Sequence, residues 1–188
     1  MSRRPLCLIV TGRPGAGKTT LAQRLAAELH LPLVSRDALK EGYVRSQGLS
    51  HQELPAETNG LVTSYFFVTL QRHLAAGISL VAEAAFQHRI WAAQLPELQS
   101  HGLTLCVVCN LEETVAAERY RQRGLNNPWR AYFHGDLSGA HVEGTGRLAP
   151  PAPYQPPTLA IPTLAVDTTE AYTPSFTDIV SFVLENYG

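Results

Sequence analysis

Residues 12–19 read Gly12-Arg13-Pro14-Gly15-Ala16-Gly17-Lys18-Thr19 and match the pattern G-x-x-x-x-G-K-[ST] at every defined position. Glycines at this spacing let the backbone turn its N–H groups inward around phosphate oxygens. A lysine in the place of Lys18 reaches the β- and γ-phosphates of a nucleotide, and a hydroxyl in the place of Thr19 binds magnesium. The stretch therefore predicts a phosphate-binding loop for ATP and Mg²⁺, formed by residues 12–19 together with Thr20.

The residues on either side of this loop support the prediction. Leu6–Val10 is a continuous apolar run that is typical of a buried parallel strand. The helix expected after the loop carries Leu21, Leu25 and Leu29 along one face and stops before Pro32. A helix that begins directly after a glycine-rich turn offers its unpaired N–H groups to an anion.

Strand-like and helix-like segments alternate along the rest of the chain. We expect further strands at Leu33–Ser35, Ile78–Glu83, Leu103–Cys109 and Leu164–Val166. We expect helices from about Asp37, over Pro55–Ala76, Arg89–Ser100 and Glu112–Arg123 (closed by Gly124), and after the N-cap Thr173, with Pro174 in first position. This alternation predicts one domain over residues 1–188, with a three-layer α/β/α fold and a five-stranded parallel sheet.

The regular pattern stops between Leu125 and Pro162. Glycine, histidine, asparagine and tryptophan are followed there by five prolines between Pro150 and Pro157. A segment of this length without regular elements inside a compact domain is typically functional. We interpret residues 119–157 as a lid or substrate-covering insertion before the last strand, with a disordered linker as the alternative.

The overall charge and the cysteines limit the classes of partner. The formal net charge of −1 does not indicate a nucleic-acid or membrane surface. The cysteines, Cys7, Cys106 and Cys109, lie in apolar runs, which is typical of reduced thiols. We assign the C-x-x-C formed by Cys106 and Cys109 to core packing rather than to zinc or redox chemistry. Because we also find no targeting segment, we expect a cytoplasmic protein.

Two carboxylates follow predicted strands. Glu83 ends the strand Ile78–Glu83, where it would face the phosphates, complete a magnesium site with Thr19 and line the substrate site. The alternative is a strand-end glutamate in solvent. Asp37 lies just past the predicted strand Leu33–Ser35, where it could accept the proton of an attacking hydroxyl or could cap the following helix.

Basic residues gather before and within the irregular segment. Arg119 and Arg123 are four positions apart, so they share one helical face and could close on a transferring phosphate. The alternative is a solvated helix end whose cations favour the helix dipole. Further polar residues of the segment are His134, Asp136, His141 and Glu143. Their spacing matches no strong zinc pattern, and we interpret them as a polar loop that faces the substrate.

At four places the chain resembles the small P-loop kinases related to polynucleotide kinase, a group that is also similar to zeta-toxin and chloramphenicol-phosphotransferase-like kinases. These places are, in order, residues 12–19, 35–40 (Ser-Arg-Asp-Ala-Leu-Lys), 119–123 and 166–169 (Val-Asp-Thr-Thr). The resemblance covers most of the chain, although residues 125–157 match no substrate signature of the group, and Glu83 stands where many relatives carry aspartate.

The resemblance also implies roles for particular residues. Asp37 would activate the substrate hydroxyl, and Lys40 would help to hold substrate or phosphate. The loop of Asp167, Thr168 and Thr169 would border the adenine pocket. A fold resemblance does not by itself identify a substrate.

Together these features predict an ATP- and Mg²⁺-dependent kinase that acts on a hydroxyl of a small-molecule acceptor. One alternative is a 5′-hydroxyl polynucleotide kinase, which the near-neutral charge does not favour. Another is a nucleotide-dependent switch or ATPase without an acceptor. With lysine only at Lys18 and Lys40, the chain has no N-K-x-D sequence of a guanine-specific GTPase, and an AAA-type motor would need a longer chain.

Overall fold

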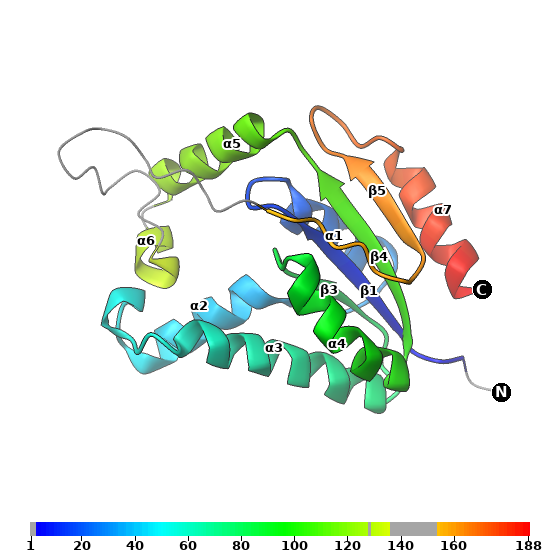
Figure 1. The fold of residues 1–188 in the computed structure, drawn as a ribbon, viewed down its shortest axis with the longest axis horizontal. Coiled ribbons are helices and arrows are strands. Elements are labelled where there is room, and N and C mark those ends of the chain that lie inside the picture. The colour runs from blue at the N-terminus through cyan, green and yellow to red at the C-terminus, as the bar shows by residue number, and fades with distance from the viewer. Residues whose placement is uncertain (1–2, 128, 136–153) are drawn as a thin grey trace.

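The computed structural model describes residues 3–127, 129–135 and 154–188 (Figure 1). Its elements are, in chain order, β1 (Leu6–Gly12), α1 (Lys18–Glu28), β2 (Leu33–Ser35), α2 (Arg36–Gln47), η1 (His51–Glu53), α3 (Thr58–Ala75), β3 (Leu80–Glu83), α4 (His88–His101), β4 (Leu103–Asn110), α5 (Glu113–Asn126), α6 (Trp129–His134), β5 (Thr163–Asp167) and α7 (Phe176–Tyr187). Asp136, His141 and Glu143 lie outside the described residues, and so does most of the proline-rich part of the segment interpreted as a lid.

The strands form one parallel sheet in the order β2-β3-β1-β4-β5. The expected five-stranded parallel sheet is thereby confirmed. β1 lies in the centre, between β3 and β4. β2 and β3 therefore lie on one side of β1, and β4 and β5 lie on the other. Parallel sheets bind ligands at the carboxyl ends of the strands where the chain changes sides in this way.

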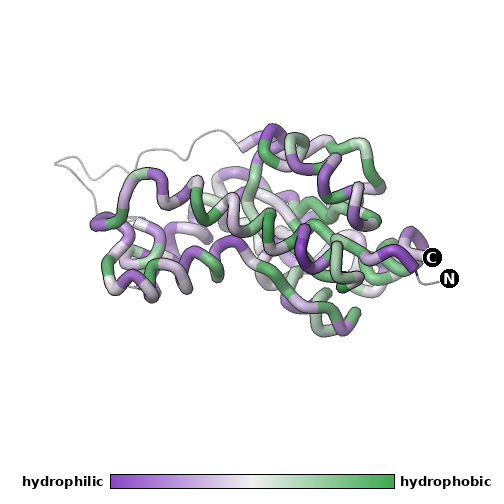
Figure 2. The backbone as a smooth tube through the Cα atoms, turned by 90° about the horizontal axis from the view of Figure 1, so that it is seen from below, coloured by the Kyte–Doolittle hydropathy of each residue, from purple (hydrophilic) through white to green (hydrophobic). Residues whose placement is uncertain are grey.

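Helices cover both faces of the sheet, as the alternating side chains of β1 show. Leu6, Leu8 and Val10 pack on one face with residues of α1 and α7, whereas Cys7 and Ile9 pack on the opposite face with residues of α3 and α4. Because successive strand residues point to opposite faces, a strand that is buried on both sides must be apolar throughout. The helices instead alternate between polar and apolar residues along their length (Figure 2). The three-layer α/β/α fold is confirmed (Figure 1).

Several expected boundaries are wrong. α5 continues through Gly124 to Asn126, and the irregular segment contains the short helix α6. α7 is capped by Ser175 rather than by Thr173, because the Ser175 and Asp178 side chains form a capping box. β3 begins at Leu80, two residues later than expected.

The expected packing role of the cysteines is confirmed. Cys7, Cys106 and Cys109 are buried and form no disulfide. Burial raises the pKa of each thiol to about 12, so none of them is a reactive thiolate at neutral pH. Among the helices within the described ranges, none has the length and apolar composition needed to cross a bilayer.

Candidate functional site

The loop between β1 and α1 has the backbone of an anion cradle. Gly15 and Gly17 have φ values of 85° and 74°, which side-chain-bearing residues rarely adopt. A side chain at Gly15 would meet the carbonyl oxygen of Ala116 at 2.1 Å, so the loop depends on glycine to pack against α5. Gly17 caps α1, and the described first turn has neither a side-chain cap nor an acidic residue. The first N–H groups of α1 are therefore available to an anion.

Lys18 and Glu83 form a buried ion pair at the carboxyl end of β3. The Lys18 Nζ lies 3.8 Å from the Glu83 Oε1, and the two side chains are only 6% and 2% exposed. Burial lowers the pKa of Lys18, while the carboxylates of Glu83 and Asp37 act in the opposite direction. The alternative of a strand-end glutamate in solvent is excluded, since Glu83 is buried.

Two hydroxyls complete the surroundings of Glu83. The Thr19 Oγ1 donates to the Glu83 Oε1 at 3.3 Å, and the Ser35 Oγ donates to Oε2 at 2.6 Å. The Thr19 hydroxyl and the Glu83 carboxylate are hard oxygen ligands, and Mg²⁺ prefers to combine one or two protein oxygens of this kind with phosphate oxygens. The donor set thus fits magnesium. Within the described ranges, no group of three or more His, Cys, Asp or Glu side chains could hold another metal ion.

Asp37 lies in the first turn of α2, directly after β2. Its alternative role as an N-cap is excluded, because Ser35 is the cap and its Oγ accepts from the Ala38 N–H at 3.5 Å. Although protein atoms surround Asp37, 48% of its side-chain surface is accessible, so desolvation is incomplete. Burial acts to raise the pKa of this carboxyl, but nearby cations outweigh it and hold the pKa below its ordinary value. These groups are, from the strongest influence to the weakest, His134 in its protonated form, Lys18, Arg36 and Arg130.

Lys40, expected to help hold substrate or phosphate, contacts the end of α6. Its side chain is buried, and the Nζ donates to the carbonyl oxygen of His134 at 3.3 Å. The next residue, Glu41, accepts a hydrogen bond from the His134 ring at 2.9 Å. Arg45 lies over the rings of Trp129 and Phe133. Lys40, Glu41 and Arg45 therefore fasten α6 to α2, and we refer to these interactions as the α2–α6 contact.

The expectation of a polar loop at His134 is wrong. His134 ends α6, and its side chain is only 6% exposed. Sequence reasoning also missed Arg36 and Arg130, which lie near Asp37. Two signals were present: Arg36 is adjacent to Asp37 in the chain, and the aromatic residues at positions 129, 132 and 133 have helical spacing.

The two arginines expected to close together on a phosphate interact with different parts of the molecule. Arg119 donates to the carbonyl oxygens of Thr168, at 2.9 Å, and of Thr169. Arg123 lies over the Tyr120 ring and its charge acts on Lys18. Arg119 therefore anchors α5 to the loop after β5. Arg123 is one of the groups that act to lower the pKa of Lys18.

The loop after β5 is joined to the phosphate-binding loop. The Thr168 hydroxyl donates to the carbonyl oxygens of Ala16, at 2.9 Å, and Asn110, at 3.1 Å. Asp167 accepts from the Thr169 N–H at 2.7 Å, which fixes the turn. Residues 167–169, expected beside the adenine, thus lie next to the loop expected to hold the phosphates.

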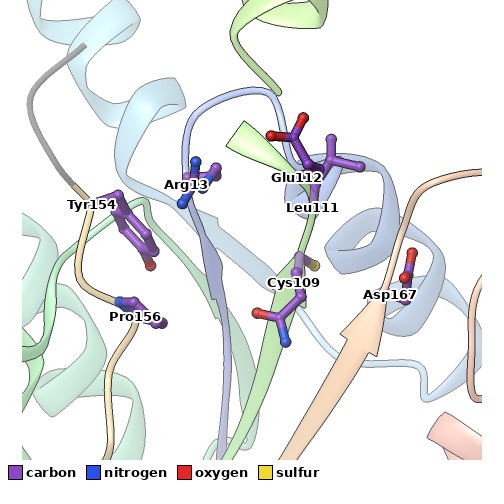
Figure 3. Close-up of a pocket in the computed structure, with 8 residues that line it drawn as sticks. Arg13, Cys109, Leu111, Glu112, Tyr154, Pro156 and Asp167 are labelled. Atoms are coloured by element: carbon purple, nitrogen blue, oxygen red, sulfur yellow. The ribbon is translucent and has the colours of Figure 1, made fainter. Parts of the chain in front are cut away.

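A hollow of about 230 Å³ opens at this edge of the sheet (Figure 3). Tyr154 and Pro156, from the segment before β5, lie on one side of it, and Asp167 lies on the other. The remaining lining residues are Arg13, Cys109, Asn110, Leu111 and Glu112. The hollow is below the range of about 300–1,000 Å³ that is usual for small-molecule sites, so it could take part of a nucleotide but not the whole.

Comparisons with known proteins agree with this arrangement. The sequence model of a family described as an AAA domain matches residues 7–136. A putative kinase from Chloroflexus aurantiacus J-10-fl is 28% identical, with 98% of this chain and 97% of that chain covered and a TM-score of 0.73. A search of curated protein sequences found no significant match.

Two further solved structures share the fold. The APS kinase CysC of Mycobacterium tuberculosis, solved with AMPPNP and APS, is 18% identical, with coverage of 99% and 98% and a TM-score of 0.62. A gluconokinase from Sinorhizobium meliloti 1021 is 21% identical, with coverage of 98% and 93% and a TM-score of 0.52. At these identities the likeness concerns the fold alone.

Proposed function

Because the chain belongs to the AAA domain family of P-loop nucleotide-binding proteins, we propose that it is an ATP- and Mg²⁺-dependent phosphotransferase that moves the γ-phosphate to a hydroxyl of a small-molecule acceptor. The resemblance to small P-loop kinases that was expected from the sequence is confirmed. We also propose that residues 1–188 form a single domain and that residues 119–157 cover the acceptor, as expected from the sequence.

The observation that carries the proposal is the position of Asp37 relative to the phosphate-binding loop. Lys18 and Glu83 are paired, and Asp37 acts electrostatically on Lys18 from the start of α2. An accessible carboxylate held in its ionised form can accept a hydrogen bond from an acceptor hydroxyl and then take its proton. In an ATPase such a group would orient water, whereas in a kinase it orients the acceptor hydroxyl.

We assign the phosphate contacts to the loop and its flanking residues. The N–H groups of residues 15–20 would bind phosphate oxygens, and the Lys18 ammonium would neutralise charge on the β- and γ-phosphates. Thr19 and Glu83 would hold magnesium, which when bound supplies further positive charge to the phosphate oxygens. Arg123 would approach the transferring phosphate from α5, and Arg119 would keep α5 in place through Thr168 and Thr169.

The adenine would lie beside residues 167–169. This assignment is supported by the bonds that connect Thr168 to the carbonyl oxygen of Ala16 in the phosphate-binding loop. Lys40 is assigned a positioning role, since its ammonium group donates to the backbone at the end of α6. In this arrangement the nucleotide occupies the β1–β4–β5 side of the sheet, and the acceptor occupies the side of β2 and α2.

A small-molecule acceptor is preferred over the alternatives. The structures from Mycobacterium tuberculosis and Sinorhizobium meliloti, which share the fold over nearly the full length of both chains, are an APS kinase and a gluconokinase, and this favours a small-molecule acceptor. A 5′-hydroxyl polynucleotide kinase remains the second candidate among kinases. Its extended substrate would need a basic groove, and the near-neutral charge of the chain does not favour one.

The test is ATP consumption measured against a panel of sugars, nucleosides, aminoglycosides, chloramphenicol-like alcohols and 5′-hydroxyl oligonucleotides. Mass spectrometry should find the phosphorylated acceptor, and Lys18→Ala should abolish its formation. Lys18→Met, which keeps more of the buried volume, controls for loss of packing. ATP binding without transfer to any acceptor would favour the switch or ATPase function instead.

A further inference from the structure

Arg36 is held rigidly next to Asp37. Its Nη1 lies 3.5 Å from the Asp37 Oδ1, and its Nη2 donates to the Asn59 Oδ1 at 3.0 Å. Asn59 belongs to the first turn of α3, so the guanidinium group is fixed between α2 and α3. The side chain is 14% exposed, and its Nε is buried and meets no hydrogen-bond acceptor within the described ranges. Buried donors normally have an acceptor, so the Arg36 guanidinium retains hydrogen-bonding capacity that its contacts within the described ranges do not use.

Arg130 approaches Asp37 from α6. It lies four residues before His134, so the two side chains share a face of that short helix. The His134 side chain contacts Glu41 of α2, and this contact turns the shared face toward α2. The guanidinium group of Arg130 also lies over the Tyr120 ring of α5, with 5.5 Å between the guanidinium carbon and the ring centroid. Arg36 and Arg130 thus reach the surroundings of Asp37 from separate elements.

The charges around Asp37 are predominantly positive. Three of the four groups that influence it most strongly, Lys18, Arg36 and Arg130, are cations, and Lys18 is assigned to the ATP phosphates. His134 is hydrogen-bonded to the Glu41 carboxylate. Arg36 and Arg130 are therefore positively charged groups near Asp37 that have no assigned function in ATP binding. An uncharged alcohol would make little use of them, whereas an anionic group would bind both.

We propose that the acceptor is a small alcohol that carries a phosphate or carboxylate group, and that Arg36 and Arg130 bind this anionic group while Asp37 receives the hydroxyl. This inference rests on the proposed kinase function. The arginines fix one end of the acceptor, so that its hydroxyl meets Asp37 and the γ-phosphate in a single orientation. Arg36 and Arg130 are therefore specificity-determining residues.

The first experiment compares acceptors that share a carbon skeleton, such as glycerol, glycerate and glycerol 3-phosphate, together with the neutral and anionic forms of any acceptor found by the panel. We expect kcat/KM for an anionic form to exceed that of its neutral form by about 100-fold or more, because two charge-assisted contacts are gained. The phosphate and carboxylate forms distinguish the two kinds of anion. Equal or better use of the neutral form would overturn the proposal.

The second experiment removes the guanidinium groups one at a time. Arg36→Gln and Arg130→Gln should each raise the KM of the anionic acceptor by about 10- to 100-fold and should reduce the anionic-to-neutral ratio by the same factor. Arg36→Lys should restore part of the loss, since it keeps the charge but not the planar donors. The matched control is Arg121→Gln, because Arg121 pairs with Glu118 on the exposed side of α5. An unchanged ratio in both variants would contradict the proposal.

A binding measurement separates failure of this inference from failure of the kinase function. The protein is saturated with Mg²⁺ and a non-hydrolysable ATP analogue and then titrated calorimetrically with glycerol 3-phosphate or inorganic phosphate. Binding that weakens about 10-fold in Arg36→Gln and Arg130→Gln, but not in Arg121→Gln, supports an anion site even if no acceptor is phosphorylated. Absence of binding, or binding that is equal in all these proteins, overturns it whether or not transfer occurs.

Discussion

The phosphate-binding loop and the α2–α6 contact lie on either side of Asp37 and differ in how the chain builds them. The loop is formed by consecutive residues between β1 and α1, and its shape depends on the backbone of Gly15 and Gly17. The α2–α6 contact joins Lys40 and Glu41 to His134, which is more than 90 positions away in sequence. The proposed phosphate site therefore depends mainly on local backbone geometry, whereas the proposed acceptor side depends on how distant helices pack.

The sharpest test of this division is Asp37→Asn. If Asp37 serves only the acceptor, kcat/KM for the acceptor should fall by about 10²- to 10⁴-fold, the usual contribution of a positioned general base. The affinity for ATP should remain unchanged, because the loop and its magnesium ligands are intact. Steady-state kinetics measures the loss of kcat/KM, and calorimetric titration measures the affinity for ATP. A parallel loss of ATP affinity would show that the two regions do not act independently.

Glu83→Gln should act mainly on the phosphate side. The concentration of Mg²⁺ needed for half-maximal activity should rise by about 10- to 100-fold, since a ligand carboxylate is replaced by a neutral amide. The variant should also be less stable, because the buried Lys18 loses its counter-charge. Glu185→Gln, which changes an exposed carboxylate of α7, is the matched control. An unaltered magnesium dependence would remove Glu83 from the proposed metal site.

The same contrast explains what the sequence could predict. The loop at residues 12–19, the apolar strands and the amphipathic helices are local patterns, so the three-layer fold and the position of Lys18 followed from spacing alone. The short helix α6 spans only Trp129–His134, and so short a helix shows too few periods to be distinguished from a loop. The different partners of Arg119 and Arg123 depend on where α5 lies against β5, which helical spacing does not encode.

Individual residues near β2 show the same limit. Both Ser35 and Asp37 are common helix caps, and only the start of α2 decides that Ser35 takes that position. The same serine also donates to Glu83, a contact that requires β2 and β3 to be neighbours. The alternation of strands and helices indicates a parallel sheet but leaves the order of its strands open.

Thr168→Val tests whether the nucleotide side is held together by a few polar bonds. The substitution removes the hydroxyl that donates to the carbonyl oxygens of Ala16 and Asn110 while keeping the shape of the side chain. Unfolding free energy should fall by about 1–3 kcal/mol, because buried acceptors lose their donor. Thr169→Val changes a more exposed threonine and should have less effect. Chemical denaturation of both variants measures the difference, and equal effects would contradict this account.

The smallest expected effect concerns the titration of Asp37. Its pKa lies below the ordinary value of 3.8, although burial acts to raise it, because Lys18, nearby arginines and the protonated form of His134 favour the carboxylate. The carboxyl should therefore stay ionised throughout the neutral range. Its contribution to stability should be present above the unfolded pKa and be lost as the pH falls through the lower folded value.

His134→Gln should raise the pKa of Asp37, since it removes the strongest of these positive influences. The change should appear in an NMR titration of the Asp37 carboxyl carbon and as an acid-side loss of kcat/KM that begins at higher pH. His101→Gln, at the end of α4, is the control because His101 pairs with Glu97 on the surface. An Asp37 titration that is identical in wild type and His134→Gln would mean that the α2–α6 contact positions α6 without tuning the carboxylate. The charge of Asp37 would then be set from the phosphate side and by Arg36, and the two regions would be coupled through Lys18 rather than separate.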